Sequence, residues 1–244
     1  MIKALTFDLD DTLWDNDGVM HRTEHGHFEW LVSELAAWQQ RRGEPLTPPI
    51  SLQDYQRERV ALGKRCWTRR GDFTWLRERT LAHLLEENGL NRASAHLWAA
   101  LAMAHFHTLR VKVAPFPGVD DMLGRLRQSY RLGSITNGNV AFQRIPLSRH
   151  FQHRIAAGEL LAPKPDPRPF LAMLALLGVK PHETLHIGDS WEEDAIPALR
   201  LGMQAVWIAP TELLVNDPLP LGVVRLPQVT ELEALLAADG GWRH

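Results

Sequence analysis

The chain has 244 residues, of which 45% are hydrophobic and 23% charged, proportions typical of a globular protein that buries a substantial core. Its 27 basic and 29 acidic residues nearly balance, so the charge gives no indication of binding to nucleic acid or to an anionic membrane. Cys66 is the only cysteine, which excludes an internal disulfide, and no apolar run reaches the roughly 18 residues that would cross a bilayer.

The first half of the chain is predicted to form one strand followed by helices. The strand, Lys3–Asp8, is short and apolar before it reaches its acidic end. Four later segments carry apolar residues at helical spacing: Arg22–Arg41, Leu52–Lys64, Phe73–Asn88 and Ala93–Arg110. Breaks rich in glycine, proline or polar residues separate them, so residues 16–113 are predicted to form an all-helical block.

After the segment "APFPGV", strands and helices alternate. The predicted strands are Arg131–Thr136, Thr184–Gly188, Gln204–Ile208 and Val223–Leu226, and the predicted helices are Asp120–Gln128, Pro167–Leu177, Glu192–Leu201 and Val229–Ala237. This alternation predicts an α/β fold with a doubly wound parallel sheet. Residues 1–15 and 114–244 would then form the α/β core, and residues 16–113 an inserted helical domain.

Polar residues gather where these strands end. Asp8, Asp10 and Asp11 follow the first strand, and "GDSWEED" follows Thr184–Gly188. In a parallel sheet such residues meet at the carboxyl edge, where ligands bind. Two like charges about 4 Å apart repel by roughly 4 kcal/mol at an effective dielectric constant near 20. A bound cation, a shared proton or a cationic partner is therefore expected among these carboxylates.

Four motifs occur in the order and at roughly the separations found in haloacid dehalogenase-like (HAD) phosphatases. They are "DLDDT", "ITNGN", Lys164 followed by Pro165, and "GDSWEED". The chain resembles this family over nearly its whole length, because the helical block lies where the family's first type of helical cap is inserted. A lone DxDxT would be a weak signal, whereas four ordered motifs are specific. In the alternative interpretation, these residues have no catalytic role and each is only a turn or helix-cap residue.

The resemblance implies that Asp8 is the nucleophile of an aspartyl-phosphate mechanism. Asp10 would protonate the leaving oxygen and then activate water. Mg²⁺ is the implied cofactor, held by Asp8, by the backbone carbonyl of Asp10 and by Asp189. Asp11 is left as a turn or helix-start residue.

The remaining motif residues would bind the phosphoryl group or support the site. Thr136, Asn137 and Lys164 are the expected phosphate-binding residues. Asp194 and Ser190 are expected to support them, with Asp194 orienting Lys164 or a metal-bound water.

The stretches of this chain that resemble one subgroup are "LTFDLDDTLWDN", "ITNGN", "LHIGDSWEEDAIPALRLGMQAVWI" and, in the helical block, "DFTWLRERTL". They are similar to bacterial phosphatases that act on flavin mononucleotide or on the phosphorylated ribitylamino-uracil intermediate of riboflavin synthesis. The expected partner is therefore a small phosphorylated molecule, in a cytoplasmic monomer or homodimer. Trp75 and Arg77 are the helical-block residues predicted to contact the leaving group, although most tryptophans there are expected to pack in the core. His21 and His25, four residues apart, lack an apparent third metal ligand and are expected on a solvated helix face.

Three alternatives remain open. The chain could be a phosphatase of sugar phosphates or of phosphoglycolate type, a haloacid dehalogenase, or a non-catalytic HAD-like binding protein. Asp10 argues against a dehalogenase, which has no leaving oxygen to protonate. A non-catalytic member would be expected to lack a motif residue, and none is missing.

Overall fold

A computed structural model describes the whole chain except residues 49, 159, 210–218 and 238–244. The chain divides into two compact units. We call the first the α/β unit; it comprises Met1–Asn16, Val113–Gly138 and Phe142–His244. We call the second the helical unit; it comprises Asp17–Lys112 and Asn139–Ala141.

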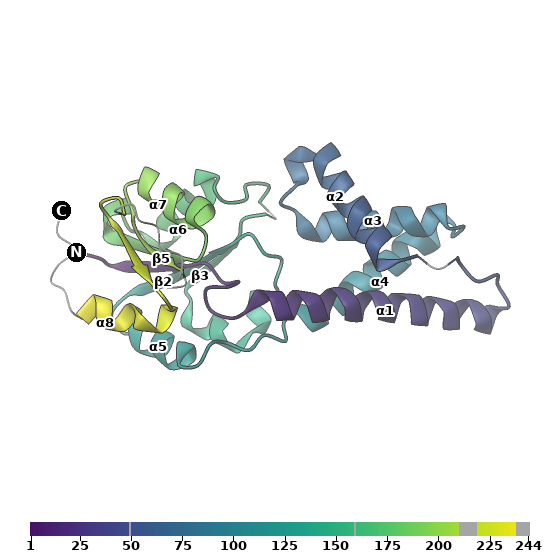
Figure 1. Cartoon of the computed structure of the whole chain (residues 1–244), viewed down its shortest axis with the longest axis horizontal. Coiled ribbons are helices and arrows are strands. Elements are labelled where there is room, and N and C mark those ends of the chain that lie inside the picture. Colours follow the sequence, from purple (N-terminus) through teal and green to yellow (C-terminus); the bar gives the residue numbers. More distant parts are fainter. Residues whose placement is uncertain (49, 159, 210–218, 238–244) are drawn as a thin grey trace. The chain divides into compact units, whose positions relative to one another are not determined.

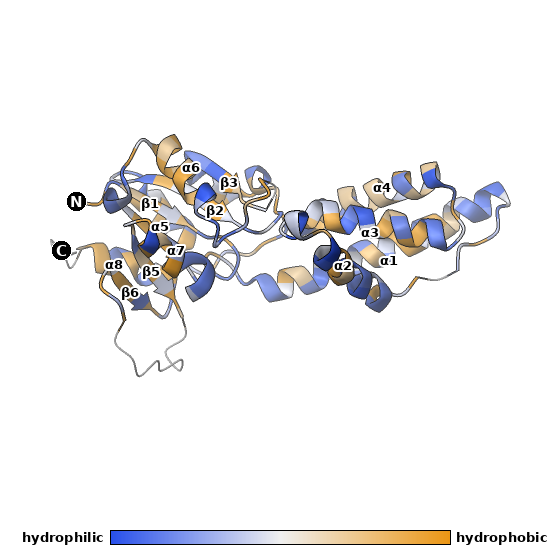
Figure 2. Ribbon diagram, turned by 90° about the horizontal axis from the view of Figure 1, so that it is seen from above, coloured by the Kyte–Doolittle hydropathy of each residue, from blue (hydrophilic) through white to orange (hydrophobic). Residues whose placement is uncertain are grey.

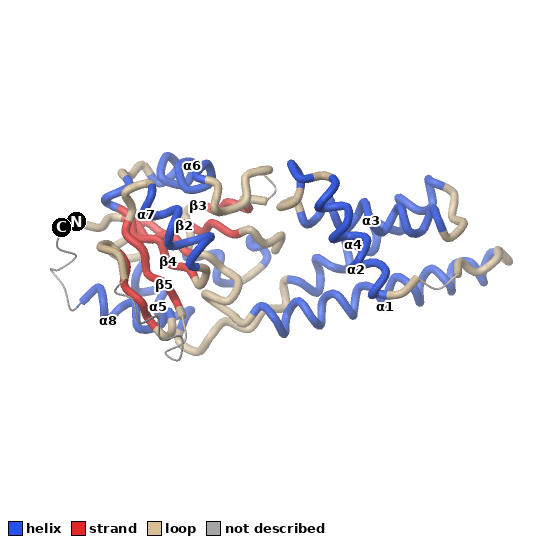
Figure 3. The backbone as a smooth tube through the Cα atoms, turned by 45° about the horizontal axis from the view of Figure 1, so that its top comes forward, coloured by secondary structure: helices blue, strands red, loops and turns tan. Residues whose placement is uncertain are grey.

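The α/β unit contains a six-stranded sheet, whose strands are red in Figure 3. Every pairing in it is parallel, as expected. The strands are β1 (Ala4–Phe7), β2 (Arg131–Thr136), β3 (His153–Ala156), β4 (Thr184–Gly188), β5 (Gln204–Ile208) and β6 (Val223–Leu226). Their order in the sheet is β3-β2-β1-β4-β5-β6. All residues of the central strands β1 and β4 are buried, which is why these strands are largely apolar.

The position of the site follows from this order. The chain builds the sheet from β1 through β2 to β3 and then crosses back to place β4 on the other side of β1. The strand order therefore reverses between β1 and β4. In open parallel sheets a crevice opens at this point, outside the carboxyl ends of the strands.

Helices cover both faces of the sheet, with α6 and α7 on one face and α5 and α8 on the other (Figure 1). They are α5 (Val119–Leu126), α6 (Pro167–Leu177), α7 (Ile196–Arg200) and α8 (Leu232–Ala237). Phe170 and Met173 of α6 belong to a core cluster that also contains Ile135 of β2 and Ala205 of β5. This packing completes the predicted doubly wound fold.

Three predictions of secondary structure were wrong in detail. The edge strand β3 was missed because only Ile155 of its four residues is fully buried. The expected helix Glu192–Leu201 begins instead as a π-helical turn, Trp191–Ala195, before α7. The expected last helix begins as a 3₁₀ turn, Val229–Glu231, before α8.

The helical unit consists of α1 (Asn16–Arg42), α2 (Leu52–Arg65), α3 (Phe73–Glu87) and α4 (Arg92–Arg110). Each of these helices carries both hydrophobic and hydrophilic residues (Figure 2). Their hydrophobic residues pack together in one core that includes Phe28, Leu81 and Trp98. Side-chain caps fix where α3 and α4 start: Asp72 accepts from the N–H of Trp75, and Asn91 from that of Ser94. None of the described helices is long and apolar enough to cross a membrane.

Candidate functional site

The segment after β1 folds back as a tight turn and buries its apolar residues. Leu9, Leu13 and Trp14 are completely buried, and the N–H of Leu13 donates to the carbonyl of Leu9 at 2.8 Å. Asp11 has a φ of 59° and accepts from the N–H of Asn16 at 2.9 Å, just where α1 begins. Asp11 is thus a turn and helix-start residue, as expected. The turn leaves Asp8, buried, and Asp10, half-buried, at the end of β1.

Lys164 is buried and is the cation closest to Asp8 among the described residues of the site. Its Nζ donates to Asp8 Oδ1 at 2.7 Å and to Asp194 Oδ1 at 2.6 Å. Burial by itself would lower the pKa of Lys164, but the adjacent Asp194 and Asp8 raise it above its ordinary value. The ammonium therefore stays charged and binds two carboxylates together.

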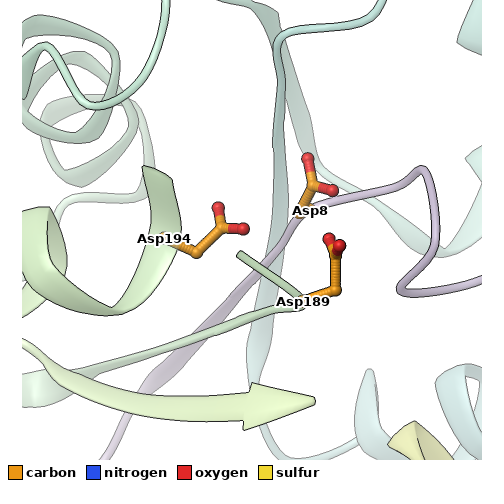
Figure 4. Close-up of side chains that lie close together, drawn as sticks. All are labelled: Asp8, Asp189 and Asp194. Carbon is orange, nitrogen blue, oxygen red and sulfur yellow. The ribbon is translucent and has the colours of Figure 1, made fainter. Parts of the chain in front are cut away.

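The acidic residues outnumber this single cation. Oxygens of Asp8, Asp189 and Asp194 lie within 4.8 Å of one another (Figure 4). Burial raises the pKa of Asp8, with Asp194 acting in the same direction against the attraction of Lys164. Burial, together with Asp194 and Asp11, raises the pKa of Asp189 to about 6. Three convergent carboxylates with too little positive charge fit a hard cation such as Mg²⁺, which prefers oxygen ligands.

The expected metal ligands match this cluster in part. Asp8 and Asp189 belong to it, whereas its third member is Asp194 and not Asp10. Asp10 was expected to contribute a backbone carbonyl. That backbone contact with a metal stays a prediction. The carboxylate Oδ1 of Asp10 accepts from the indole N–H of the buried Trp14 at 2.9 Å, which fixes the orientation of the Asp10 side chain.

Asp194 is placed by the π-helical turn. The N–H groups of Asp194 and Ala195 both donate to the carbonyl of Ser190, at 3.0 and 3.3 Å. Ser190 also caps the turn, because its hydroxyl accepts from the N–H of Glu193, and its own N–H donates to Asp194 Oδ2 at 3.2 Å. Ser190 therefore shapes the turn that carries Asp194, and its supporting role in the chemistry stays a prediction. Short π segments are often found at functional sites.

Gly188, the last residue of β4, allows the Asp194 carboxylate to approach the strand. A Cβ atom at Gly188 would lie 2.3 Å from Asp194 Cγ, much closer than real Cβ contacts. Asp194 accepts hydrogen bonds from Lys164 and His186, which hold its pKa down at about 2 despite its burial. Asp194 is therefore ionised at neutral pH.

Asn137 and Thr136 end β2, at the same edge of the sheet as Asp8. The Asn137 side chain brackets the backbone of Lys164: its Oδ1 accepts from the Lys164 N–H at 2.7 Å and its Nδ2 donates to the Lys164 carbonyl at 3.0 Å. The Asn137 side chain thus helps to place Lys164, and a phosphate contact from Asn137 stays a prediction. The Thr136 hydroxyl accepts from the Gly138 N–H at 2.9 Å, which shapes the turn after β2.

Sequence reasoning missed His186, which lies completely buried in β4. Its two ring nitrogens contact Thr6 Oγ1 and Asp194 Oδ1, both at 2.9 Å. A polar residue in the middle of the run "TLHIG" was the available signal, because a buried polar group needs a partner.

The residues singled out in the helical unit have partners within that unit. Arg77 is buried, donates to Glu24 Oε1 at 3.3 Å and lies 4.7 Å from the ring centroid of Phe106. Trp75 lies beneath the guanidinium of Arg69 at 5.1 Å. Contact of Trp75 or Arg77 with a leaving group stays a prediction. His21 and His25 are exposed, with ring centroids 4.4 Å apart, and no group of three metal-binding side chains among the described residues includes them.

Comparison with known proteins identifies relatives over most of the chain. Residues 2–202 match the family of haloacid dehalogenase-like hydrolases. The 5-amino-6-(5-phospho-D-ribitylamino)uracil phosphatase YigB of Escherichia coli (strain K12) is 32% identical over 209 residues, which are 86% of this chain and 84% of YigB. The glyceraldehyde 3-phosphate phosphatase of Methanopyrus kandleri is 28% identical over 85% of this chain and 84% of its own length.

A solved structure also matches nearly the whole chain. The 2-haloacid dehalogenase from Pseudomonas syringae pv. Tomato DC3000 superposes with a TM-score of 0.85 at 32% identity, and the match covers 98% of this chain and 99% of that one. The curated relatives are thus named as phosphatases of small phosphorylated molecules, and this structural relative is named as a dehalogenase. The sheet, the four motifs and these relatives agree that the chain belongs to the haloacid dehalogenase-like hydrolase family.

Proposed function

We propose that this chain is a Mg²⁺-dependent phosphatase that uses Asp8 as its nucleophile and hydrolyses a phosphorylated ribitylamino-uracil of riboflavin synthesis. The observation that carries the proposal is the pairing of Asp8 with the buried Lys164, while a second carboxylate, Asp10, is held two residues further on by Trp14. The substrate is proposed from the likeness to YigB over most of both chains. Flavin mononucleotide is a second candidate, since it ends in the same ribityl phosphate.

In the first step, a carboxylate oxygen of Asp8 attacks phosphorus, and the bond from phosphorus to the leaving oxygen breaks. Asp10 gives its proton to that oxygen, so the product leaves as an alcohol. In the second step, Asp10 takes a proton from water, and the water oxygen attacks phosphorus. Inorganic phosphate leaves and the Asp8 carboxylate is restored.

Lys164 and Thr136 would bind the phosphoryl oxygens. Because the Lys164 ammonium is buried, little water would screen its attraction to these oxygens. Asp8 and Asp189 would hold Mg²⁺ together with the carbonyl of Asp10. The ion, when bound, would neutralise charge on the phosphoryl group and on the clustered carboxylates. Asp194 would anchor Lys164 opposite Asp8.

The dehalogenase reading has support from the Pseudomonas syringae structure. It gives no function to Asp10, because a halide ion leaves without a proton. A dehalogenase also needs no divalent cation to relieve repulsion between a nucleophilic carboxylate and a phosphate. The acidic cluster and the orientation of Asp10 by Trp14 therefore favour phosphatase chemistry.

One assay tests the proposal. Purified protein would be given a panel of phosphorylated metabolites, including the ribitylamino-uracil phosphate and flavin mononucleotide, and a 2-haloacid in parallel. We expect phosphate release that disappears on chelation and returns with Mg²⁺, and no halide release. Halide release without phosphatase activity would overturn the proposed chemistry. Full phosphatase activity after rigorous chelation would overturn the proposal that Mg²⁺ is required.

A further inference from the structure

A chain of buried polar contacts runs from β1 to the site and ends at Lys164. Thr6 Oγ1 contacts His186 Nδ1 at 2.9 Å, and His186 Nε2 contacts Asp194 Oδ1 at 2.9 Å. The same Asp194 oxygen accepts from Lys164 Nζ at 2.6 Å. Thr6 and His186 are both completely buried, and the proposed chemistry gives neither of them a task.

The contacts determine which ring nitrogen of His186 carries the hydrogen. An ionised carboxylate only accepts hydrogen bonds, so Nε2 must be the N–H that faces Asp194. His186 is completely buried, and burial favours the neutral ring over the charged one, so a ring that carries its hydrogen on Nε2 has a bare Nδ1. The Thr6 hydroxyl is the group that donates to Nδ1. Thr6 thus selects the ring tautomer that can donate to Asp194.

The surroundings hold the Asp194 carboxylate from several sides. The N–H of Ser190 donates to Oδ2, while Lys164 and His186 share Oδ1. The edge-on ring of Phe170, with its centroid 5.0 Å from that of His186, keeps the imidazole in place. A carboxylate fixed in this way gives Lys164 an anchor with one orientation.

We propose that His186, in the tautomer selected by Thr6, is a positioning residue that fixes Asp194 and so keeps the Lys164 ammonium directed at Asp8 and the phosphoryl group. The inference rests on the phosphoryl-binding role proposed for Lys164. Without the imidazole donor, Lys164 would be the one remaining partner of Asp194 Oδ1 described above, beside the Ser190 N–H on Oδ2, and the carboxylate would draw the ammonium away from Asp8. Buried hydrogen-bond partners that orient the groups around an active site typically change activity by about 10- to 100-fold when they are removed.

Three variants separate this positioning role from simple packing. His186→Leu keeps the apolar volume and removes both hydrogen bonds, whereas the amide N–H of His186→Gln can replace Nε2. Thr6→Val keeps the shape of Thr6 and removes the hydroxyl that selects the tautomer. We expect kcat to fall about 10- to 100-fold in His186→Leu and to stay within about fivefold of wild type in His186→Gln. Thr6→Val should lie between them, and KM should change little in all three.

Each variant would be measured with Mg²⁺ on an aryl phosphate, with circular dichroism and thermal unfolding to establish folding. Equal losses in His186→Leu and His186→Gln, or no loss in either, would overturn the inference. If His186→Leu does not fold, Thr6→Val is compared with His186→Gln. A larger loss of kcat in Thr6→Val than in His186→Gln would support the inference, and equal losses, or no loss in either, would overturn it. Full activity in Lys164→Met would instead remove the role of Lys164 itself, which distinguishes failure of the proposed function from failure of this inference.

The wild-type protein offers a readout that packing does not influence. Nitrogen-15 NMR of the histidine rings distinguishes the two neutral tautomers directly. We expect His186, assigned by its absence from the spectrum of His186→Gln, to be protonated at Nε2 near neutral pH. A hydrogen on Nδ1 would overturn the inference, because Nε2 could not then donate to Asp194.

Discussion

At the scale of single residues, Lys164 is where the buried charges of the site meet. It joins carboxylates from two separate parts of the chain, and the Asn137 side chain holds its backbone from both sides. The sequence predicted Lys164 as a motif residue, and the structure brings it into contact with Asp8 and Asp194. The sequence could not show that Asn137 serves Lys164, because a polar residue after a strand is equally compatible with a turn or a ligand contact.

Replacing Lys164 tests this arrangement. Lys164→Met keeps much of the side-chain length and removes the charge, so we expect kcat to fall by about 10³-fold or more, as when a preorganised charge at a developing oxyanion is lost. The measurement is steady-state hydrolysis with Mg²⁺, and Lys180→Met, at an exposed lysine, is the matched control. Near-normal kinetics in Lys164→Met would show that this ammonium does not act on the phosphoryl group.

At the scale of elements, the end of β4 and the π-helical turn depend on each other. We expect Gly188→Ala to lower kcat at least about tenfold, because its Cβ would lie 2.3 Å from Asp194 Cγ and displace that side chain. Gly124→Ala, in α5, is the control: its Cβ would meet only His150 Cε1 at 3.5 Å, an ordinary contact. That change should preserve activity and stabilise the fold by up to about 1 kcal/mol. Equal activity of the two variants would contradict the close approach.

Helix α1 contains another completely buried histidine, which should make stability depend on pH. His27 is completely buried between Phe106 and Tyr55, and its Nδ1 contacts the Thr23 carbonyl at 3.0 Å. Burial lowers its pKa from 6.5 to about 4, and the positive charge of Arg77 acts in the same direction against Thr23 and Glu24. The folded protein therefore keeps this ring neutral at pH values where the unfolded chain protonates it.

The direction of this pH dependence follows from the uptake of a proton by the unfolded chain. Between about pH 6.5 and 4, His27 is protonated in the unfolded chain but not in the folded protein. The contribution of His27 to the free energy of unfolding is therefore complete above pH 6.5 and is lost as the pH falls. We expect the free energy of unfolding to drop by about 2 kcal/mol from this residue between pH 7 and pH 5. Chemical denaturation at both pH values, compared with His27→Phe, measures it. A drop of the same size in His27→Phe would assign the effect to other groups.

The elements show where sequence patterns suffice and where they do not. β1, β4 and β5 are apolar runs bounded by polar residues, and their pattern alone predicted them. β3 has mixed polarity because it lies at the edge of the sheet. The π turn brings Asp194 against Gly188, and His186 contacts Thr6 and Asp194. Such features depend on contacts between distant segments, which a local pattern does not encode.

At the scale of the whole molecule, the proposed chemistry lies within one unit. Asp8, Lys164, Asp189 and Asp194 all belong to the α/β unit. These residues would handle the phosphoryl group that all phosphomonoesters share. Discrimination between leaving groups is predicted to fall to the helical unit, as the resemblance to cap-bearing phosphatases implies.

Trp75 tests that division. We expect Trp75→Ala to change the ranking of phosphorylated metabolites while altering the hydrolysis of a small aryl phosphate by less than about threefold, since the aryl ester needs only the phosphoryl site. The measurement is kcat/KM across the panel, with thermal unfolding to monitor the helical unit. A uniform loss on every substrate would assign Trp75 to the stability of that unit.

The central claim is that Asp8 becomes phosphorylated, whereas Asp10 donates a proton to the leaving oxygen and then accepts one from water. Asp10→Asn keeps the nucleophile and removes the acid and the base, so an activated aryl phosphate should still phosphorylate the enzyme, but hydrolysis of the acyl phosphate should slow. Rapid acid quench of Asp10→Asn, followed by intact mass measurement and peptide mapping, would detect the intermediate directly. We predict one added phosphoryl group, located on Asp8 and absent from the double variant Asp8→Asn, Asp10→Asn. A phosphoryl group on Asp189 or Ser190, or none in a variant that still turns over, would contradict the account.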